Sequence, residues 1–281
     1  MSTTRLASDI PATGRTADGT AFDISGPDGA PVMVLIHGLG LCRRLWDHHL
    51  PALAAGHRVL RYDLYGHGDS APPPSSGALC EVSLTVYADQ LAWLLDHLDI
   101  ASAVIVGFSI GGMINRRFAM DYPGRTAALV ILNSPHDRGP QAQEQVEARA
   151  AAVRDEGRMA TMDAALDRWF TPVFRQDTPS VMRLVREWRK IVDPESYAAA
   201  AAVLAHGVRE LERPHPPINC LSLVVTCEND TGSTPSMSRA IGTEIDGAEV
   251  QIIGRLQHLG LIEEPAAFIG PILAFCERTK T

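Results

Sequence analysis

The chemical signal that stands out in this sequence is a serine between glycines. Residues 107–111 read Gly-Phe-Ser-Ile-Gly, so that Ser109 follows an apolar run and precedes a helical pattern that begins at Ile110. A nucleophilic serine on so tight a strand-to-helix turn stands above the sheet edge, and the flanking glycines remove Cβ atoms that would clash in the bend. We therefore expect Ser109 to be a nucleophile rather than a helix cap in a glycine-rich turn.

A histidine near the end of the chain is the expected base. A serine hydroxyl is a weak nucleophile at neutral pH, so it needs a base, and the base needs an orienting acid. Behind a serine turn of this kind, the acid comes next along the chain and the histidine last. His258 is the one histidine after His215, and it lies in a loop five residues beyond the strand-like run 249–253. We expect His258 to reach over the sheet edge and accept the serine proton.

Three carboxylates compete for the role of the acid, which should lie at the end of an earlier strand. Glu228 and Asp230 both follow the apolar run 220–226, and Asp137 comes shortly after the run that ends at residue 133. We favour Asp230 and keep Glu228 and Asp137 as alternatives. The carboxylates that are not the acid would be ordinary loop or helix-cap residues.

Two backbone amides are candidates for an oxyanion hole. The first is the N–H of Ile110, the residue after the expected nucleophile. The second should come from the loop after the first buried strand, where the run 32–37 is followed by Gly38-Leu39-Gly40. We therefore expect the N–H of Leu39 to be the second donor.

These residues need elements that bring them together, and the sequence supplies alternating strands and helices. A hairpin is expected over residues 15–25. Residues 83–99 carry one apolar helical stripe, with Ser83 as the N-cap. Strands are expected at residues 32–37, 57–63, 103–107, 128–133, 220–226 and 249–253. Such alternation predicts an α/β fold, with a mostly parallel central sheet and helices on both faces.

One segment breaks the alternation. Residues 134–217 contain four helical patterns and no convincing strand, which predicts a helical lid inserted into an α/β core made of residues 1–133 and 218–281. The stretch 141–190 has nine basic and eight acidic residues, whereas the whole chain has a net charge of −8. We therefore expect the acidic balance to be a property of the core that favours solubility, not a property of the site.

Composition excludes several classes of protein. An acidic chain without a basic block is a poor binder of nucleic acid. The five cysteines are scattered and contain no C-x-x-C pair, and neither a metal-binding spacing nor a phosphate-binding loop is present. The first 14 residues lack the apolar stretch of a signal peptide, and no run is long enough for a membrane helix. We expect a cytoplasmic protein with a small-molecule substrate, no metal and no cofactor, and a homo-oligomer is compatible with the sequence.

Taken together, the motifs resemble the α/β-hydrolase superfamily over nearly the whole chain. The matching pieces are HGLG at 37–40, DLYGHGDS at 63–70, GFSIGG at 107–112, ENDTGSTP at 228–235 and HLGLIEEP at 258–265. The resemblance implies a Ser109–Asp230–His258 triad, a lid after the sixth strand, and hydrolysis without a metal or an organic cofactor. The chain departs from many members at Cys227, where they have glycine.

Within that superfamily the sequence is most similar to the 3-oxoadipate enol-lactonase group and to small-molecule esterases, on the stretches HGLGLCRRLWDHHLPAL and GFSIGGM. This likeness implies hydrolysis of a carboxylic ester or a lactone. Hydrolases of carbon–carbon or amide bonds and cofactor-free haloperoxidases use the same triad and are the alternatives. A binding module that has lost catalysis is a further alternative, although no member of the triad is missing.

The substrate pocket is expected between the sheet and the lid, with a mainly apolar lining. Trp46, Trp169 and Phe170 are candidates for that lining, and the last two could equally belong to the lid's own core. Arg43 and Arg44 lie next to the oxyanion loop in the sequence. They are candidates for binding a substrate carboxylate, or else ordinary surface residues.

Overall fold

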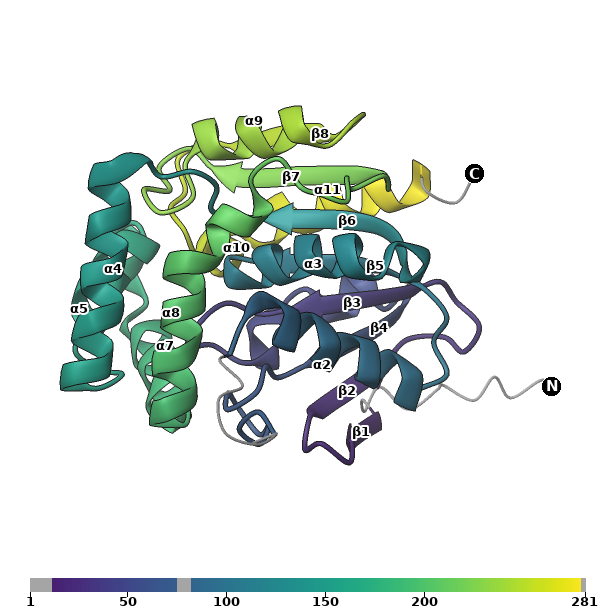
Figure 1. Cartoon of the computed structure of the whole chain (residues 1–281), viewed down its shortest axis with the longest axis horizontal. Coiled ribbons are helices and arrows are strands. Elements are labelled where there is room, and N and C mark those ends of the chain that lie inside the picture. Colours follow the sequence, from purple (N-terminus) through teal and green to yellow (C-terminus); the bar gives the residue numbers. More distant parts are fainter. Residues whose placement is uncertain (1–11, 75–81, 279–281) are drawn as a thin grey trace.

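The apolar runs form the strands of a single sheet, which the computed structural model shows in Figure 1. Residues 12–74 and 82–278 are described. The sheet has eight strands in the order β1-β2-β4-β3-β5-β6-β7-β8. The strands are β1 (Ala12–Arg15), β2 (Ala21–Ser25), β3 (Val32–Ile36), β4 (Arg58–Tyr62), β5 (Ala103–Phe108), β6 (Thr126–Leu132), β7 (Ser222–Cys227) and β8 (Glu249–Ile253).

The strands from β4 to β8 pair in parallel, which confirms the predicted mostly parallel sheet. Among the described strands, antiparallel pairing is confined to β1 with β2, which form a hairpin, and β2 with β4. In the parallel part, Ile36 pairs with Gly107 and Phe108 pairs with Leu132. The loops that follow these strands therefore leave the sheet at one edge, where the sequence motifs are brought together.

Helices cover both faces of the sheet because side chains alternate along each buried strand. On one face, Val34 and Ile36 pack with residues of α2 and α3, and on the other, Met33 and Leu35 pack with residues of α11. Figure 1 shows α2 and α3 in front of the sheet and α11 behind it. The helices outside the segment between β6 and β7 are α1 (Leu50–Leu53), α2 (Leu84–His97), α3 (Ile110–Asp121), α9 (Pro235–Glu244), α10 (Gly260–Glu263) and α11 (Pro265–Arg278), with short 3-10 turns at Arg43–Trp46 and Pro123–Arg125.

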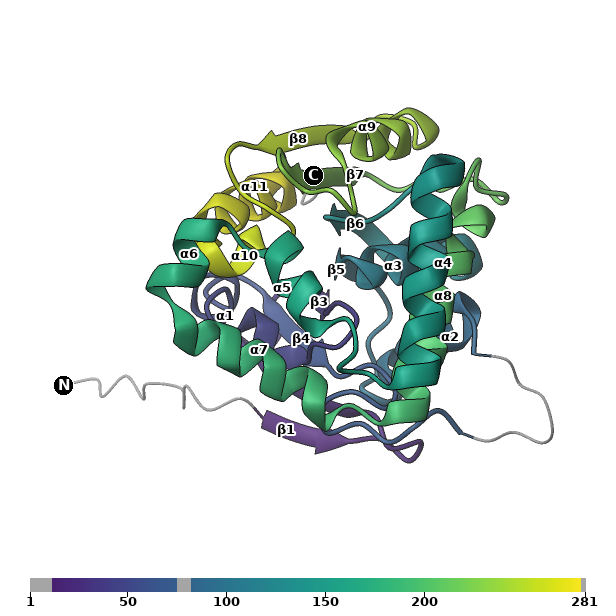
Figure 2. The ribbon, with the colours of Figure 1, turned by 90° about the vertical axis from the view of Figure 1, so that its left-hand side faces the viewer.

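Between β6 and β7 the chain forms helices joined by loops, and no strand. It forms α4 (Gly139–Glu156), α5 (Met162–Trp169), α6 (Pro172–Asp177), α7 (Pro179–Ile191), α8 (Pro194–His206) and a 3-10 turn, Gly207–Leu211. We call residues 134–217 the helical segment. The short helix α6 was not predicted, since it has only six residues, of which the first is Pro172, and Pro179 follows soon after its end. Figures 1 and 2 show α4, α5, α7 and α8 beside the carboxyl ends of the parallel strands, over the edge where the motifs meet.

Most of the N-terminal stretch and one of the five cysteines lie outside the described residues. Residues 1–11, which make up most of the stretch examined for a signal peptide, lie outside the described ranges, and so does Cys80. Cys42, Cys220 and Cys227 are free thiols. Within residues 12–74 and 82–278, no helix combines the length and the apolar character that crossing a bilayer requires.

Candidate active site

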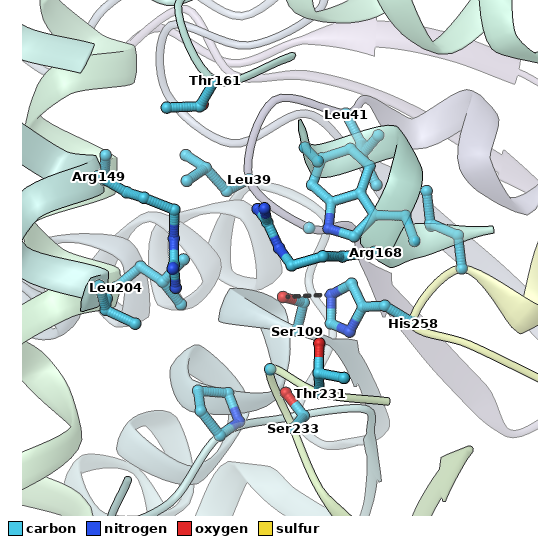
Figure 3. Close-up of a pocket in the computed structure, with 18 of the residues that line it drawn as sticks. Leu39, Leu41, Ser109, Arg149, Thr161, Arg168, Leu204, Thr231, Ser233 and His258 are labelled. Atoms are coloured by element: carbon cyan, nitrogen blue, oxygen red, sulfur yellow. Dashed lines mark hydrogen bonds between the residues drawn. The ribbon is translucent and has the colours of Figure 1, made fainter. Parts of the chain in front are cut away.

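Ser109 lies on a strained turn between β5 and α3. Its backbone has φ 59° and ψ −117°, a conformation that residues other than glycine rarely adopt. The neighbouring glycines are required by space: a Cβ on Gly107 would lie 2.1 Å from the carbonyl oxygen of Gly111, and one on Gly111 would lie 2.7 Å from that of Ile36. The turn therefore lifts the Ser109 hydroxyl out of the sheet and into a cavity (Figure 3).

A continuous chain of hydrogen bonds links the serine to a carboxylate. His258 Nε2 lies 3.1 Å from Ser109 Oγ, and His258 Nδ1 lies 2.7 Å from Asp230 Oδ2. An ionised carboxylate only accepts, so Nδ1 carries the proton and Nε2 is left to accept from the serine hydroxyl. Ser109 follows β5, Asp230 follows β7 and His258 follows β8, and the three loops meet at one edge of the sheet. Figure 3 shows Ser109 and His258 facing each other.

Asp230 is buried and held by three further donors. The amides of Gly232 and Ser233 each donate to its Oδ1 at 2.9 Å, and Asn133 Nδ2 donates to Oδ2 at 2.9 Å. Asn133 directly follows β6 and adopts a positive φ of 45°. Sequence reasoning missed this residue, although its position immediately after a buried strand at the same sheet edge was a usable signal.

The two alternative carboxylates have other partners. Glu228 Oε2 accepts from the amide of Arg255 at 2.9 Å, and the exposed Asp137 accepts from the amide of Gly139 at 2.8 Å. Neither carboxylate is hydrogen-bonded to His258, whose Nδ1 is engaged by Asp230. The arrangement favours Asp230 as the acid of a catalytic chain.

The loop after β3 is held by His37, another residue that sequence reasoning did not single out. The amide of Leu64 donates to His37 Nε2 at 2.9 Å, so Nδ1 carries the proton and donates to the carbonyl of Gly38 at 2.8 Å. In a trans peptide the C=O and the next N–H point in opposite directions, so this bond also orients the amide of Leu39. Within the described residues, no hydrogen-bond partner is assigned to the amides of Leu39 and Ile110.

The cavity around Ser109 encloses about 950 Å³, its open mouth included. The helical segment contributes more than half of the lining, and the strand-end loops supply the rest. Among the predicted lining residues, Trp169 lies in the wall, with its ring centroid 6.2 Å from that of His258. The lining comprises Gly38, Leu39, Leu41, Phe108, Ser109, Pro135, Arg138, Val146, Arg149, Ala150, Val153, Thr161, Ala165, Arg168, Trp169, Arg189, Tyr197, Ala201, Leu204, Asp230, Thr231, Gly232, Ser233, His258 and Leu259.

The other three predicted pocket residues lie elsewhere, which corrects the sequence expectation. Trp46 is fully buried in the core on the α11 face of the sheet, and Phe170 is fully buried and stacks on Phe174. The guanidinium of Arg43 forms ion pairs with the carboxylates of Asp23, Asp63 and Asp69. These pairs turn Arg43 away from the cavity. Arg44, the second arginine beside that loop, pairs with Asp47 at the surface.

Residues 31–185 match the family described as alpha/beta hydrolase fold. The chain belongs to this family. A curated relative, 3-oxoadipate enol-lactonase 2 of Acinetobacter baylyi, is 28% identical over 267 residues, which are 94% of this chain and 96% of the relative. The enol-lactonase of Burkholderia xenovorans LB400 is a structural neighbour with a TM-score of 0.81 and 28% identity, covering 92% of this chain and 96% of that chain.

A second structural neighbour is a thermophilic esterase from Thermogutta terrifontis. It has a TM-score of 0.80 and 26% identity, and the match covers 97% of this chain and 100% of the esterase. Together with the family match, these relatives support an enzyme of the α/β-hydrolase family. No group of three or more His, Cys, Asp or Glu residues suited to a metal ion occurs in the described part of the chain.

Proposed function

We propose that the chain is a serine hydrolase that cleaves a carboxylic ester or a lactone of a small molecule. The observation that carries the proposal is the bonded series Ser109–His258–Asp230, which lines a cavity that is open to solvent. The names of the enol-lactonase and esterase relatives support the choice of an ester or lactone bond.

The proposed reaction begins with proton transfer from Ser109 Oγ to His258 Nε2 as the oxygen attacks the substrate carbonyl. The carbonyl oxygen becomes an oxyanion, which the amides of Leu39 and Ile110 stabilise, and the loss of one such donor typically costs about 100- to 1000-fold in rate. Asp230 keeps the proton of neutral His258 on Nδ1 and stabilises the imidazolium that forms.

The second half of the reaction returns the enzyme to its starting state. His258 gives its proton to the leaving oxygen, which in a lactone stays attached to the acyl group. A water molecule then loses a proton to His258 Nε2 and attacks the acyl-enzyme, and the released serine oxygen takes that proton back. We also propose that residues 134–217 act as a cap over the core formed by residues 1–133 and 218–281, since this segment supplies much of the cavity wall.

The test is the Ser109→Ala variant, assayed with p-nitrophenyl acetate and with a panel of lactones and amides. We expect loss of hydrolysis without loss of the thermal unfolding transition, because the substitution only removes a hydroxyl. Labelling by a fluorophosphonate probe should occur in the natural chain and disappear in the variant. A folded chain that takes no label, or a Ser109→Ala variant that remains active, would refute the proposal.

A further inference from the structure

Four arginines line the cavity of Ser109, and all of them come from the helical segment between β6 and β7. They are Arg138, Arg149, Arg168 and Arg189. Among the described residues, the one carboxylate in this lining is Asp230, which is already engaged by His258 and three other donors. The cavity therefore holds more positive charge than its own groups neutralise.

Arg149 on α4 and Arg168 on α5 are the two of these arginines whose guanidinium groups have the fewest partners within the protein. Arg168 donates to the carbonyl of Ala164 in its own helix at 2.8 Å, and neither arginine forms an ion pair with a carboxylate of the described chain. Figure 3 shows both guanidinium groups extending into the cavity that holds Ser109 and His258. Arg138, in contrast, is bonded to Gln143 and to the carbonyl of Leu204.

Arg189 adds a buried positive charge to the same lining. The residue is 2% exposed, and its guanidinium carbon lies 4.9 Å from the ring centroid of Trp169 and 5.3 Å from that of Tyr197. Its buried Nε has no hydrogen-bond partner. Burial lowers the pKa of Arg149, Arg168 and Arg189. Neighbouring arginines lower the pKa of Arg149 and Arg189 further, whereas Asp167 and Tyr197 partly offset the lowering at Arg168. An anion in the cavity would relieve both costs.

We propose that the substrate carries a carboxylate that binds between Arg149 and Arg168 while its ester or lactone carbonyl lies at Ser109. This inference rests on the proposed hydrolase function and adds the charge of its substrate. Arginine pairs with carboxylates through charge-assisted, often bidentate hydrogen bonds, and these strengthen when the ligand excludes water. A neutral substrate of the same shape would leave both guanidinium groups desolvated without a partner.

The experiment compares two p-nitrophenyl esters of similar length, the anionic half-ester of glutaric acid and the neutral hexanoate. We expect kcat/KM to favour the anionic ester by about 10- to 100-fold. Arg149→Met and Arg168→Met should each lower the ratio of the two kcat/KM values by about 10-fold or more. The matched control is Arg154→Met, since Arg154 lies on α4, is exposed and pairs with Asp155, so this variant loses the same charge and should keep the ratio.

The outcomes separate this inference from the proposed function. Equal kcat/KM for both esters, with both reactions lost in Ser109→Ala, would leave the hydrolase standing and overturn the carboxylate site. If neither ester is cleaved, binding of glutarate decides: it should raise the unfolding temperature of the natural chain and of Arg154→Met, but not that of Arg149→Met or Arg168→Met. If glutarate leaves the unfolding temperature of the natural chain unchanged, the carboxylate site is overturned.

Discussion

Replacing Asp230 by asparagine should disable the site through the tautomer of His258. The amides of Gly232 and Ser233 both donate to Asp230 Oδ1, so the introduced amide must put its oxygen there. Its NH₂ group then takes the position of Oδ2, 2.7 Å from His258 Nδ1. Because an NH₂ group donates, Nδ1 has to accept, and the imidazole proton moves to Nε2.

A proton on Nε2 faces Ser109 Oγ across 3.1 Å and leaves the serine without a base. The loss associated with a wrong histidine tautomer in a serine triad is about 10⁴-fold in kcat, or about 5 kcal/mol of transition-state stabilisation. Asn133 can turn its amide so that its oxygen accepts from the new NH₂ group, so the buried site keeps its hydrogen bonds. We therefore expect Asp230→Asn to fold normally and to lose activity.

The assay is steady-state hydrolysis of p-nitrophenyl acetate, with the residual rate of Ser109→Ala subtracted. Glu228→Gln is the matched control, because its new amide oxygen can still accept from the Arg255 amide that Glu228 binds at 2.9 Å. Asp137→Asn is a second control, at an exposed carboxylate. The tautomer argument is wrong if Asp230→Asn hydrolyses p-nitrophenyl acetate within 10-fold of the natural rate. It is also wrong if Glu228→Gln loses as much activity as Asp230→Asn.

Two further predictions concern buried histidines. The His37→Phe substitution removes the hydrogen bond that orients the Leu39 amide. The kcat for p-nitrophenyl acetate should therefore fall about 10-fold or more, while KM changes less. An unchanged kcat would count against this role of His37. Burial lowers the pKa of His37 and His49 to about 4 and that of His67 to about 3. Below about pH 6.5 the unfolded chain therefore binds more protons, and stability should fall by about 3 kcal/mol between pH 6.5 and 5.5. Urea unfolding at both pH values measures this, and a flat profile would contradict it.

The elements that position the site could be predicted because their signals are local. The parallel strands are buried on both faces, so their side chains form continuous apolar runs such as 103–107. The strained turn at Ser109 requires glycines two residues away on either side, and the sequence displays both. The order of serine, acid and histidine then narrowed the base to one histidine, His258.

The residues that were missed or misassigned depend on where a side chain points, which spacing does not specify. Arg43 follows the oxyanion loop in the sequence, but three carboxylates draw its guanidinium away from the cavity. Trp46 and Phe170 are buried in packed cores because a large apolar ring gains more there than at a polar site. Asn133 contacts Asp230 across 97 positions of sequence, and only the pairing of β6 with β7 brings them together.

The net charge of the helical segment does not reveal the arginines that line the cavity. Residues 141–190 have nine basic and eight acidic residues, a near balance that gives no sign of charged residues in the cavity wall. Seven of the eight carboxylates are exposed, whereas Arg149, Arg168 and Arg189 line the cavity. Three of the nine basic residues and none of the eight acidic ones therefore line the cavity. Water screens charges at the exposed surface more strongly than charges in the cavity, so these three arginines matter more at Ser109 than the near balance suggests. On the proposal that a carboxylate binds between Arg149 and Arg168, the cavity favours an anion even though the chain as a whole carries a charge of −8.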